Sequence, residues 1–259
     1  MSHIVKYKNE GLFVIEDMFS IDELGEIDNE IDRISRSGNE GIVYENDGES
    51  IRSINGAHKY SDLMNDITRN KRIVSIAKDI LIDHIYIHQF KINLKKGFDG
   101  DVWEWHQDYY FWNKEDGMPT PNAISAAIFL DDITEFNGPL IFIPSTHTGE
   151  TYSFPERKND INYRNFDKWR KTTASKLKYK YDKNIITSLV KNNGLYSPKG
   201  NRGSVLFFHS NIFHASGVNI SPFDRRLLII TYNSVSNKLL PVEEPRPEFM
   251  ASRDFSVIE

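Results

Sequence analysis

The sequence WHQD at residues 105–108 contains a candidate pair of metal ligands. His106 and Asp108 stand two residues apart, so on an extended strand both side chains point to the same face and can bind one metal ion. The chain contains no cysteine, and a metal must therefore be held by histidine and carboxylate side chains. The remaining histidines are the candidates for a third ligand: His3, His58, His84, His88, His147, His209 and His214.

His214 is the strongest of these candidates. It follows the apolar run at residues 205–208 and precedes a stretch rich in turn-forming residues at 215–219. His209 stands five residues before His214, so on a continuous strand its side chain would face the opposite side. Two histidines and one carboxylate form the facial triad of non-haem Fe(II) oxygenases. A lone H-x-D pattern is weak support, because short motifs often match by chance.

Arg225 gives the metal motif a second feature. It follows His214 by eleven residues and precedes an apolar run at 227–232 that is typical of a strand. A fixed guanidinium binds a carboxylate through two parallel hydrogen bonds, and a 2-oxo acid that chelates a metal carries such a carboxylate at its far end. An arginine that only braces a loop is the plainer alternative.

The first third of the chain is expected to be helical. Ser20 and Glu23 form a capping-box pattern ahead of apolar residues that recur at helical spacing up to Ile34. A second helical pattern covers residues 73–81. Short strands, separated by Gly, Pro and Asn turns, are predicted after it at residues 84–93, 123–130, 140–143, 204–208 and 227–232.

Helices followed by many short strands predict a mainly β domain with flanking helices, built as an antiparallel sandwich or barrel. Residues 150–200 are dense in Lys, Tyr, Asn and Asp and have little periodicity, so we expect a divergent insertion or lid there. No Pro/Gly/Ser-rich linker divides the chain, and residues 1–259 are therefore expected to form a single domain.

The composition excludes several classes of function. A formal charge of −5 provides no basic surface for nucleic acid or anionic lipid. No stretch approaches the roughly 20 apolar residues of a membrane span. We therefore expect a soluble, cytoplasmic protein, a monomer or homodimer, that acts on a small molecule.

The chain resembles the phytanoyl-CoA hydroxylase superfamily of Fe(II)/2-oxoglutarate dioxygenases, in which the pattern His106-x-Asp108, His214 and Arg225 recurs. The resemblance covers most of residues 10–149 and 200–255. It implies a double-stranded β-helix core, a jelly-roll of the cupin-like kind. The matching blocks are residues 86–93, 100–103, 105–109, 111–112, 115–118, 137–140, 231–233 and 245–249.

Within the superfamily these blocks are most similar to bacterial free L-proline trans-4-hydroxylases, and next to ectoine hydroxylases, which share the EDGMP stretch at residues 115–119. Around the metal motif, the chain resembles the proline hydroxylases at Gln107, Tyr109 and Phe111. Ile229 stands at a strand position where an aromatic residue would be expected for ectoine.

Three features depart from the family pattern. Ala215 replaces the glycine that usually follows the distal histidine, and His209 stands where an aspartate is usual. Residues 150–200 resemble neither subfamily. These departures leave the metal ligands His106, Asp108 and His214 in place.

The resemblance implies hydroxylation of a free amino acid, with L-proline giving trans-4-hydroxy-L-proline, succinate and CO2. The cofactor and cosubstrates would be Fe(II), 2-oxoglutarate and O2. The implied iron ligands are His106, Asp108 and His214, and the implied 2-oxoglutarate contacts are Arg225, Ser216 and Asn93. The candidate substrate contacts are Gln89, Arg52, His58, Trp112 and Trp103.

Position in the sequence suggests each substrate contact. Gln89 lies on the same strand face as Asn93, whereas His88 is expected to point to the opposite face. The two tryptophans flank the metal motif and could equally belong to the core. Arg52 and His58 lie in a stretch that resembles the proline hydroxylases, and either could instead be a solvated polar residue.

Three other functions remain open. The enzyme could act on another cyclic amino acid, such as pipecolate or ectoine. The same three ligands could hold Zn²⁺ for hydrolysis, which would leave Arg225 without a role. The barrel could also bind a small molecule without turnover.

Overall fold

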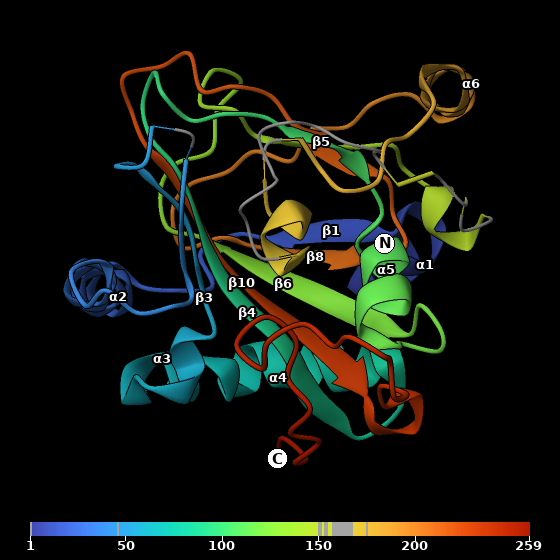
Figure 1. Ribbon diagram of the computed structural model, residues 1–259. Coiled ribbons are helices and arrows are strands. Elements are labelled where there is room, and N and C mark those ends of the chain that lie inside the picture. The colour runs from blue at the N-terminus through green and yellow to red at the C-terminus, as the bar shows by residue number, and fades with distance from the viewer. Residues whose placement is uncertain (1, 46, 150–151, 153–154, 157–167, 175) are drawn as a thin grey trace.

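Two antiparallel sheets form the centre of the computed structural model, which describes residues 2–45, 47–149, 152, 155–156, 168–174 and 176–259. The smaller sheet lies over one face of the larger, giving a jelly-roll core (Figure 1). The larger sheet consists, in spatial order, of β1 (Leu12–Ile15), β8 (Val205–His209), β6 (Ala123–Phe129), β10 (Arg225–Ser234), β4 (Ile85–Lys95), β3 (Ile51–Asn55) and β2 (Ile42–Tyr44). The smaller sheet consists of β5 (Trp103–His106), β9 (His214–Ser216) and β7 (Leu140–Phe142).

Strand β4 shows how the two faces of the larger sheet differ. Phe90 and Ile92 enter the hydrophobic core beneath the helices. Gln89, Lys91 and Asn93 point to the other face, where they line a pocket. Because side chains alternate along a strand, one segment of sequence supplies both a core face and a site face.

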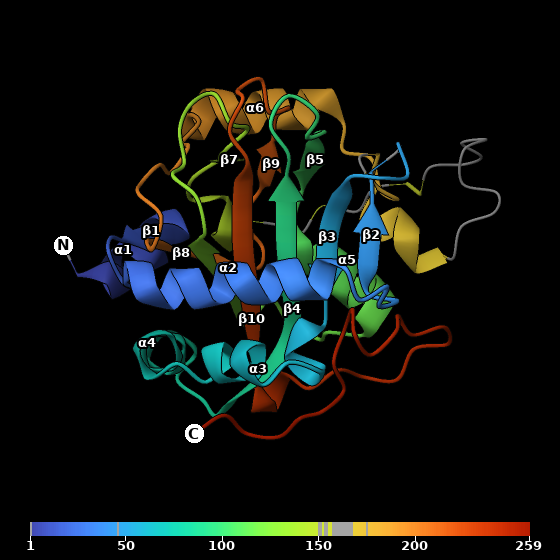
Figure 2. The ribbon, with the colours of Figure 1, turned by 90° about the vertical axis from the view of Figure 1, so that its left-hand side faces the viewer.

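Helices cover the face of the larger sheet that is opposite the pocket. In Figure 2, α2 crosses in front of β10, β4 and β3, with α3 and α4 below it. Apolar side chains of α2 and α4 share one core with the sheet, and burying them removes a continuous apolar stripe from water. The helices are α1 (His3–Glu10), α2 (Ile21–Ser35), α3 (Asp62–Thr68), α4 (Lys71–Leu81), α5 (Asp108–Phe111) and α6 (Lys183–Asn193).

The predicted helices and strands are confirmed. The amide of Ser20 donates to Glu23 Oε2 at 2.7 Å and the amide of Glu23 donates to Ser20 Oγ at 3.3 Å, which completes the capping box of α2. The second helical pattern forms α4, and the five expected strands are β4, β6, β7, β8 and β10.

The first third of the chain contains more than helices. It also contributes β1, β2 and β3, which the sequence analysis missed because they have only three to five residues each and no clear alternation. The region at 150–200 lies partly outside the described residues. Its described part includes a 3-10 turn, Lys168–Thr172, and α6, with Leu177 and Tyr181 buried beside them.

In the part of the chain that the structure describes, no helix has the length and apolar character needed to cross a membrane.

Candidate active site

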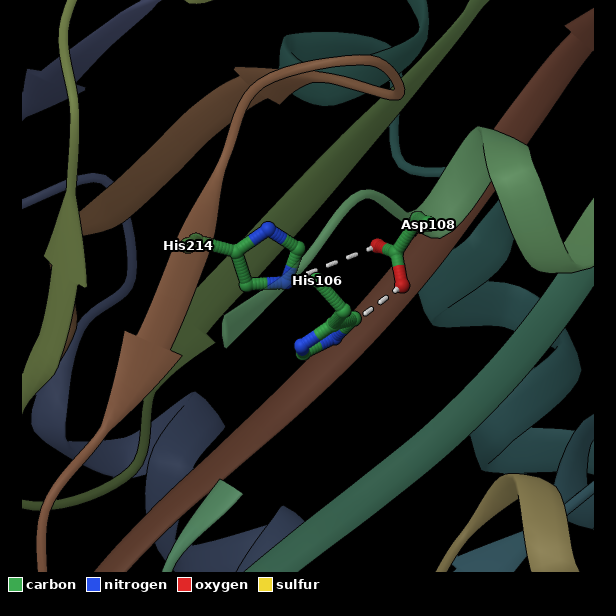
Figure 3. Close-up of side chains that lie close together, drawn as sticks. All are labelled: His106, Asp108 and His214. Carbon is green, nitrogen blue, oxygen red and sulfur yellow. Dashed lines mark ion pairs between the residues drawn. The ribbon is translucent and has the colours of Figure 1, made fainter. Parts of the chain in front are cut away.

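The three proposed metal ligands come from two neighbouring strands and one helix (Figure 3). His106 ends β5 and His214 begins β9, and the two residues are directly opposite each other in the antiparallel pair. The sequence analysis placed Asp108 on the same strand as His106, and this is wrong, because Asp108 begins α5. Gln107 between them is extended, with φ −114° and ψ 125°, and this keeps Asp108 on the same side as His106.

The ligand atoms of His106, Asp108 and His214 all lie within 4.8 Å of one another, and all three residues are buried. His106 Nε2 is 3.7 Å from Asp108 Oδ1, and His214 Nε2 is 3.9 Å from Asp108 Oδ2. Figure 3 shows the carboxylate facing both imidazoles. The structure therefore brings together the triad that the sequence predicted.

Hydrogen bonds on the far side of each imidazole orient the ring toward this centre. His106 Nδ1 lies 2.6 Å from the carbonyl oxygen of Glu104, and His214 Nδ1 lies 3.1 Å from that of Ile212. A carbonyl only accepts, so both Nδ1 atoms carry the proton and both Nε2 lone pairs are free to bind a metal.

The charges of the triad also suit a cation. Asp108 Oδ2 is buried and has no hydrogen-bond partner among the described residues. Burial lowers the pKa of His106 to about 3 and also lowers the pKa of His214, so both rings are neutral at pH 7. Burial by itself raises the pKa of Asp108, but Lys91 and the two imidazoles outweigh it and lower that pKa. Two neutral imidazoles and one carboxylate form a donor set that fits Fe(II).

A pocket opens beside the triad, between the two sheets. The predicted residues that line it, besides the metal ligands, are Gln89, Asn93, Trp103, Trp112 and Arg225.

Arg225 is a buried cation at one end of this pocket. Its Nε and Nη2 donate to the carbonyl oxygen of Gly138 at 3.2 and 2.9 Å, and Nη2 also donates to Ser216 Oγ at 3.1 Å. It forms no ion pair with a carboxylate of the described chain. Burial lowers its pKa to about 10, so it remains charged at pH 7. Asn93 lines the same pocket, and its Oδ1 is buried without a partner among the described residues.

The structure does not bring Arg52 and His58 into the pocket. Arg52 is buried behind Trp103 with its guanidinium 3.9 Å from the centre of the indole ring, and its charge is balanced by Glu45 at 3.1 Å. His58 packs against Phe90, on the face of β4 that meets the helices. Resemblance in the stretch 51–58 could not show this, because sequence alone does not reveal the carboxylate partner of a buried arginine.

The expected orientation of His88 is wrong. A register shift between Thr231 and Tyr232 interrupts the alternation of β4 at this point. The His88 ring packs edge-on against Trp112, with ring centres 5.0 Å apart, and its Nε2 lies 3.4 Å from Asp116. It is a buried residue behind the pocket wall and does not join the triad.

His209 lies outside the group formed by His106, Asp108 and His214. The spacing argument assumed one continuous strand, whereas His209 ends β8 of the larger sheet and His214 begins β9 of the smaller sheet. Its ring packs near those of His147 and Tyr7, at 5.1 and 5.7 Å between ring centres, and its Nδ1 accepts the amide of Asn211.

Sequence reasoning missed six polar residues of the pocket, which are Ser53, Asn55, Lys91, Thr172, Thr173 and Arg246. Lys91 could have been found, because it lies between Gln89 and Asn93 in a strand whose alternate side chains share a face. Thr172 and Thr173 lie in a segment without periodicity, where no local signal identifies them. Ser53, Asn55 and Arg246 lie in stretches that resemble the proline hydroxylases, but the resemblance does not show that their side chains line the pocket.

The jelly-roll core and the His-x-Asp and distal His triad define a non-haem Fe(II), 2-oxoglutarate-dependent dioxygenase. The model of the phytanoyl-CoA dioxygenase family matches residues 7–227. The chain belongs to this family.

Known proteins with similar sequences support the same class. The chain is 36% identical to an L-proline trans-4-hydroxylase of Streptomyces griseoviridis over 253 residues, covering 96% of this chain and 91% of the relative. It is 34% identical to an ectoine dioxygenase of Sphingopyxis alaskensis over 257 residues, covering 95% and 81%.

A solved structure shows the same fold. The crystal structure of EctD from S. alaskensis with 2-oxoglutarate and 5-hydroxyectoine has a TM-score of 0.82 and 32% identity, and covers 98% of this chain and 84% of that chain. Another structure of that enzyme has bound Fe. These similarities support iron and 2-oxoglutarate as the cofactor and cosubstrate of the present chain.

Proposed function

We propose that this protein hydroxylates a free cyclic amino acid, and that its substrate is L-proline, converted to trans-4-hydroxy-L-proline with release of succinate and CO2. The similarity to an L-proline trans-4-hydroxylase over nearly the whole of both chains supports the substrate class. We further propose that the protein works in the cytoplasm, as a monomer or homodimer.

The row of polar side chains on the pocket face of β4 is the observation that carries this proposal. Lys91 lines the pocket, and its side chain forms no ion pair or hydrogen bond with the described residues. Gln89 Nε2 is buried and also has no partner there. A cation and an amide donor two residues apart on one strand face match the carboxylate of an amino acid, which would relieve both unpaired groups.

Arg225 is the proposed partner of the 2-oxoglutarate C5 carboxylate, with Ser216 and Asn93 beside it. Because Gly138 and Ser216 fix the guanidinium, its remaining N–H groups keep one orientation toward the pocket. The two anions therefore have separate cations, Arg225 for the cosubstrate and Lys91 for the substrate. Iron held by the triad, together with 2-oxoglutarate and O2, supplies the oxidising chemistry that hydroxylates an unactivated C–H bond.

Apolar side chains would hold the ring of the substrate. Trp112, Phe208 and Ile229 line the pocket together with the metal ligands. Trp112 is buried and fixed by its edge-on contact with His88, so it provides a rigid wall. Such a wall decides which C–H bond faces the metal, and positioning is the main contribution of the protein to selectivity.

Ectoine is the second candidate, because several ectoine dioxygenases are 29–34% identical to the chain over almost its whole length. Ectoine also has a carboxylate that Lys91 could bind. The aliphatic Ile229 in the pocket favours the smaller proline ring, since a bulkier ring gains more from an aromatic wall.

The test is reconstitution of the purified protein with Fe(II) and 2-oxoglutarate under air, with L-proline, L-pipecolate and ectoine offered separately. The proposal predicts a product with one added oxygen from L-proline, formed together with succinate, and its position is then assigned by NMR. Preferential conversion of ectoine or pipecolate would refute proline as the substrate while keeping the class of substrate. No product from any of the three would refute both.

A further inference from the structure

Two buried arginines each donate a hydrogen bond to one short turn, formed by residues 168–173, which we call the pocket turn. It is the yellow turn near the centre of Figure 1. We propose that Arg52 and Arg246 are positioning residues that hold the pocket turn as one wall of the substrate site. This inference rests on the proposed function, because it assigns the binding of the amino acid to this wall.

The pocket turn contributes directly to the pocket. Thr172 and Thr173 are both buried and line it together with His106 and Asp108. The hydroxyl groups of the two threonines donate to carbonyl oxygens within the turn, Thr172 Oγ1 to Trp169 at 2.6 Å and Thr173 Oγ1 to Arg170 at 3.0 Å. These local bonds shape the turn but do not attach it to the barrel.

Arg246 attaches the turn to the C-terminal segment. Its Nη1 donates to Thr172 Oγ1 at 3.2 Å, while Nε and Nη2 donate to the two oxygens of Asp116 at 2.8 and 2.5 Å. Asp116 is fully buried and ends the helical stretch Trp112–Asp116 that follows the metal-binding helix. The turn is thus linked through one guanidinium to the segment that carries Trp112.

Arg52 attaches the turn to the larger sheet. From β3 its Nε donates to the carbonyl oxygen of Thr173 at 2.8 Å, and its Nη2 donates to the carbonyl oxygen of Val102 at 2.8 Å. Glu45 accepts from Nη1 at 3.1 Å and balances the charge. The guanidinium lies over the Trp103 ring, 3.9 Å from the ring centre, and this cation–π contact helps to hold it in place.

Arg52 and Arg246 differ from Lys91 and Arg225, the proposed ligand-binding cations, in whether a carboxylate of the protein balances their charge. Arg52 and Arg246 each have a carboxylate partner inside the protein, whereas Lys91 and Arg225 form no ion pair with the described chain. A substrate anion therefore gains little from Arg52 or Arg246 directly. Through Thr172 and Thr173 they shape the wall that faces the amino acid, so the KM for the amino acid should change more than the KM for 2-oxoglutarate.

The first test changes one contact at a time. Thr172→Val removes the acceptor of Arg246 and keeps the Arg246–Asp116 pair, and Thr172→Ser restores the hydroxyl. We expect Thr172→Val to raise the KM for the amino acid about tenfold, with the KM for 2-oxoglutarate changed by less than about twofold. Thr172→Ser should recover most of the loss. An unchanged KM for the amino acid, or an equal rise in both KM values, would overturn the proposal.

The second test does not depend on turnover. Hydrogen exchange of the peptide at residues 168–174 is measured in Thr172→Val, Arg52→Gln and a control, Arg226→Gln. Arg226 forms a comparable ion pair with Asp131 but lies outside the pocket. We expect faster exchange of this peptide, by about tenfold, in the first two variants only. Unchanged exchange, or the same acceleration in the control, would show that the arginines only stabilise the fold.

The two tests also separate this inference from the proposed function. If the wild-type protein does not hydroxylate L-proline, the proposed substrate fails, and the exchange measurement still decides whether the arginines hold the turn. If Arg52→Gln does not fold, Thr172→Val carries the test alone.

Discussion

Replacing Lys91 by Met is the change that most directly tests how the pocket binds an amino acid. The replacement keeps the length of the side chain and removes its charge. Lys91 lines the pocket beside Gln89 and Asn93 and forms no ion pair with the described residues. Losing a charged hydrogen bond to the substrate carboxylate costs about 2–3 kcal/mol, or roughly 30- to 150-fold in the KM for L-proline.

The assay is succinate formation at varied L-proline with saturating 2-oxoglutarate, and then at varied 2-oxoglutarate. We expect the KM for 2-oxoglutarate to change by less than about threefold, because Arg225 binds that anion separately. Lys91→Arg keeps the charge and should lose much less affinity for L-proline. Lys178→Met is a matched control, since Lys178 pairs with Glu115 at 2.8 Å and does not line the pocket.

Iron binding gives an independent check on the same variant. Lys91 is one of the charges that lower the pKa of Asp108. Its removal also takes away a positive charge that repels Fe(II), so iron affinity should stay the same or increase. A KM for L-proline within threefold of wild type, together with a large rise in the KM for 2-oxoglutarate, would refute the assignment of Lys91 to the substrate.

Four further predictions follow from the site and the core. Asp108→Ala should abolish iron-dependent hydroxylation with an unchanged circular dichroism spectrum, and retained turnover would contradict the triad. Arg225→Met should raise the KM for 2-oxoglutarate at least about 30-fold, since a buried charge partner is worth about 2–5 kcal/mol, and an unchanged KM would move the C5 carboxylate elsewhere. Gly138→Ala should weaken 2-oxoglutarate binding and lower the urea midpoint, because φ is +67° and a Cβ would lie 2.8 Å from the Gly217 carbonyl oxygen. Burial lowers the pKa of His58 to about 4 and that of His209 to about 3, so the unfolded chain takes up protons first and stability should fall as pH drops from about 6.5 toward 4. The urea midpoint at pH 7.5 and pH 5 measures this loss, and replacing both histidines by Gln should reduce it.

The sequence predicted the helices and strands whose apolar residues recur at a clear period, and the metal ligands whose spacing in the sequence is recognisable. The capping box at Ser20, the helix at 73–81 and the long strands all appear where the pattern placed them. The triad was predictable because His106 and Asp108 are only two residues apart and His214 follows an apolar run typical of a strand. Arg225 was predictable from its place at the start of β10, and it does lie in the pocket.

The residues that sequence reasoning misplaced depend on contacts between distant segments. The sequence alone could not show that Arg52 is not a substrate contact, because its hydrogen bonds to Glu45 and Thr173 are known only from the structure. His88 was misjudged because a bulge changes the alternation of β4, and such bulges have no reliable signal in a single sequence. Arg246 and Thr172 meet across 74 positions of the chain, and only the folded structure brings them together.

The central claim is that the His106, Asp108 and His214 site hydroxylates L-proline with oxygen taken from O2. The most direct measurement is a reaction under isotopically labelled O2, with mass analysis of the amino acid and of succinate. We expect one labelled oxygen atom in trans-4-hydroxy-L-proline and one in succinate, formed in equal amounts. Label missing from both products, or succinate formed at the same rate with and without L-proline, would contradict the account.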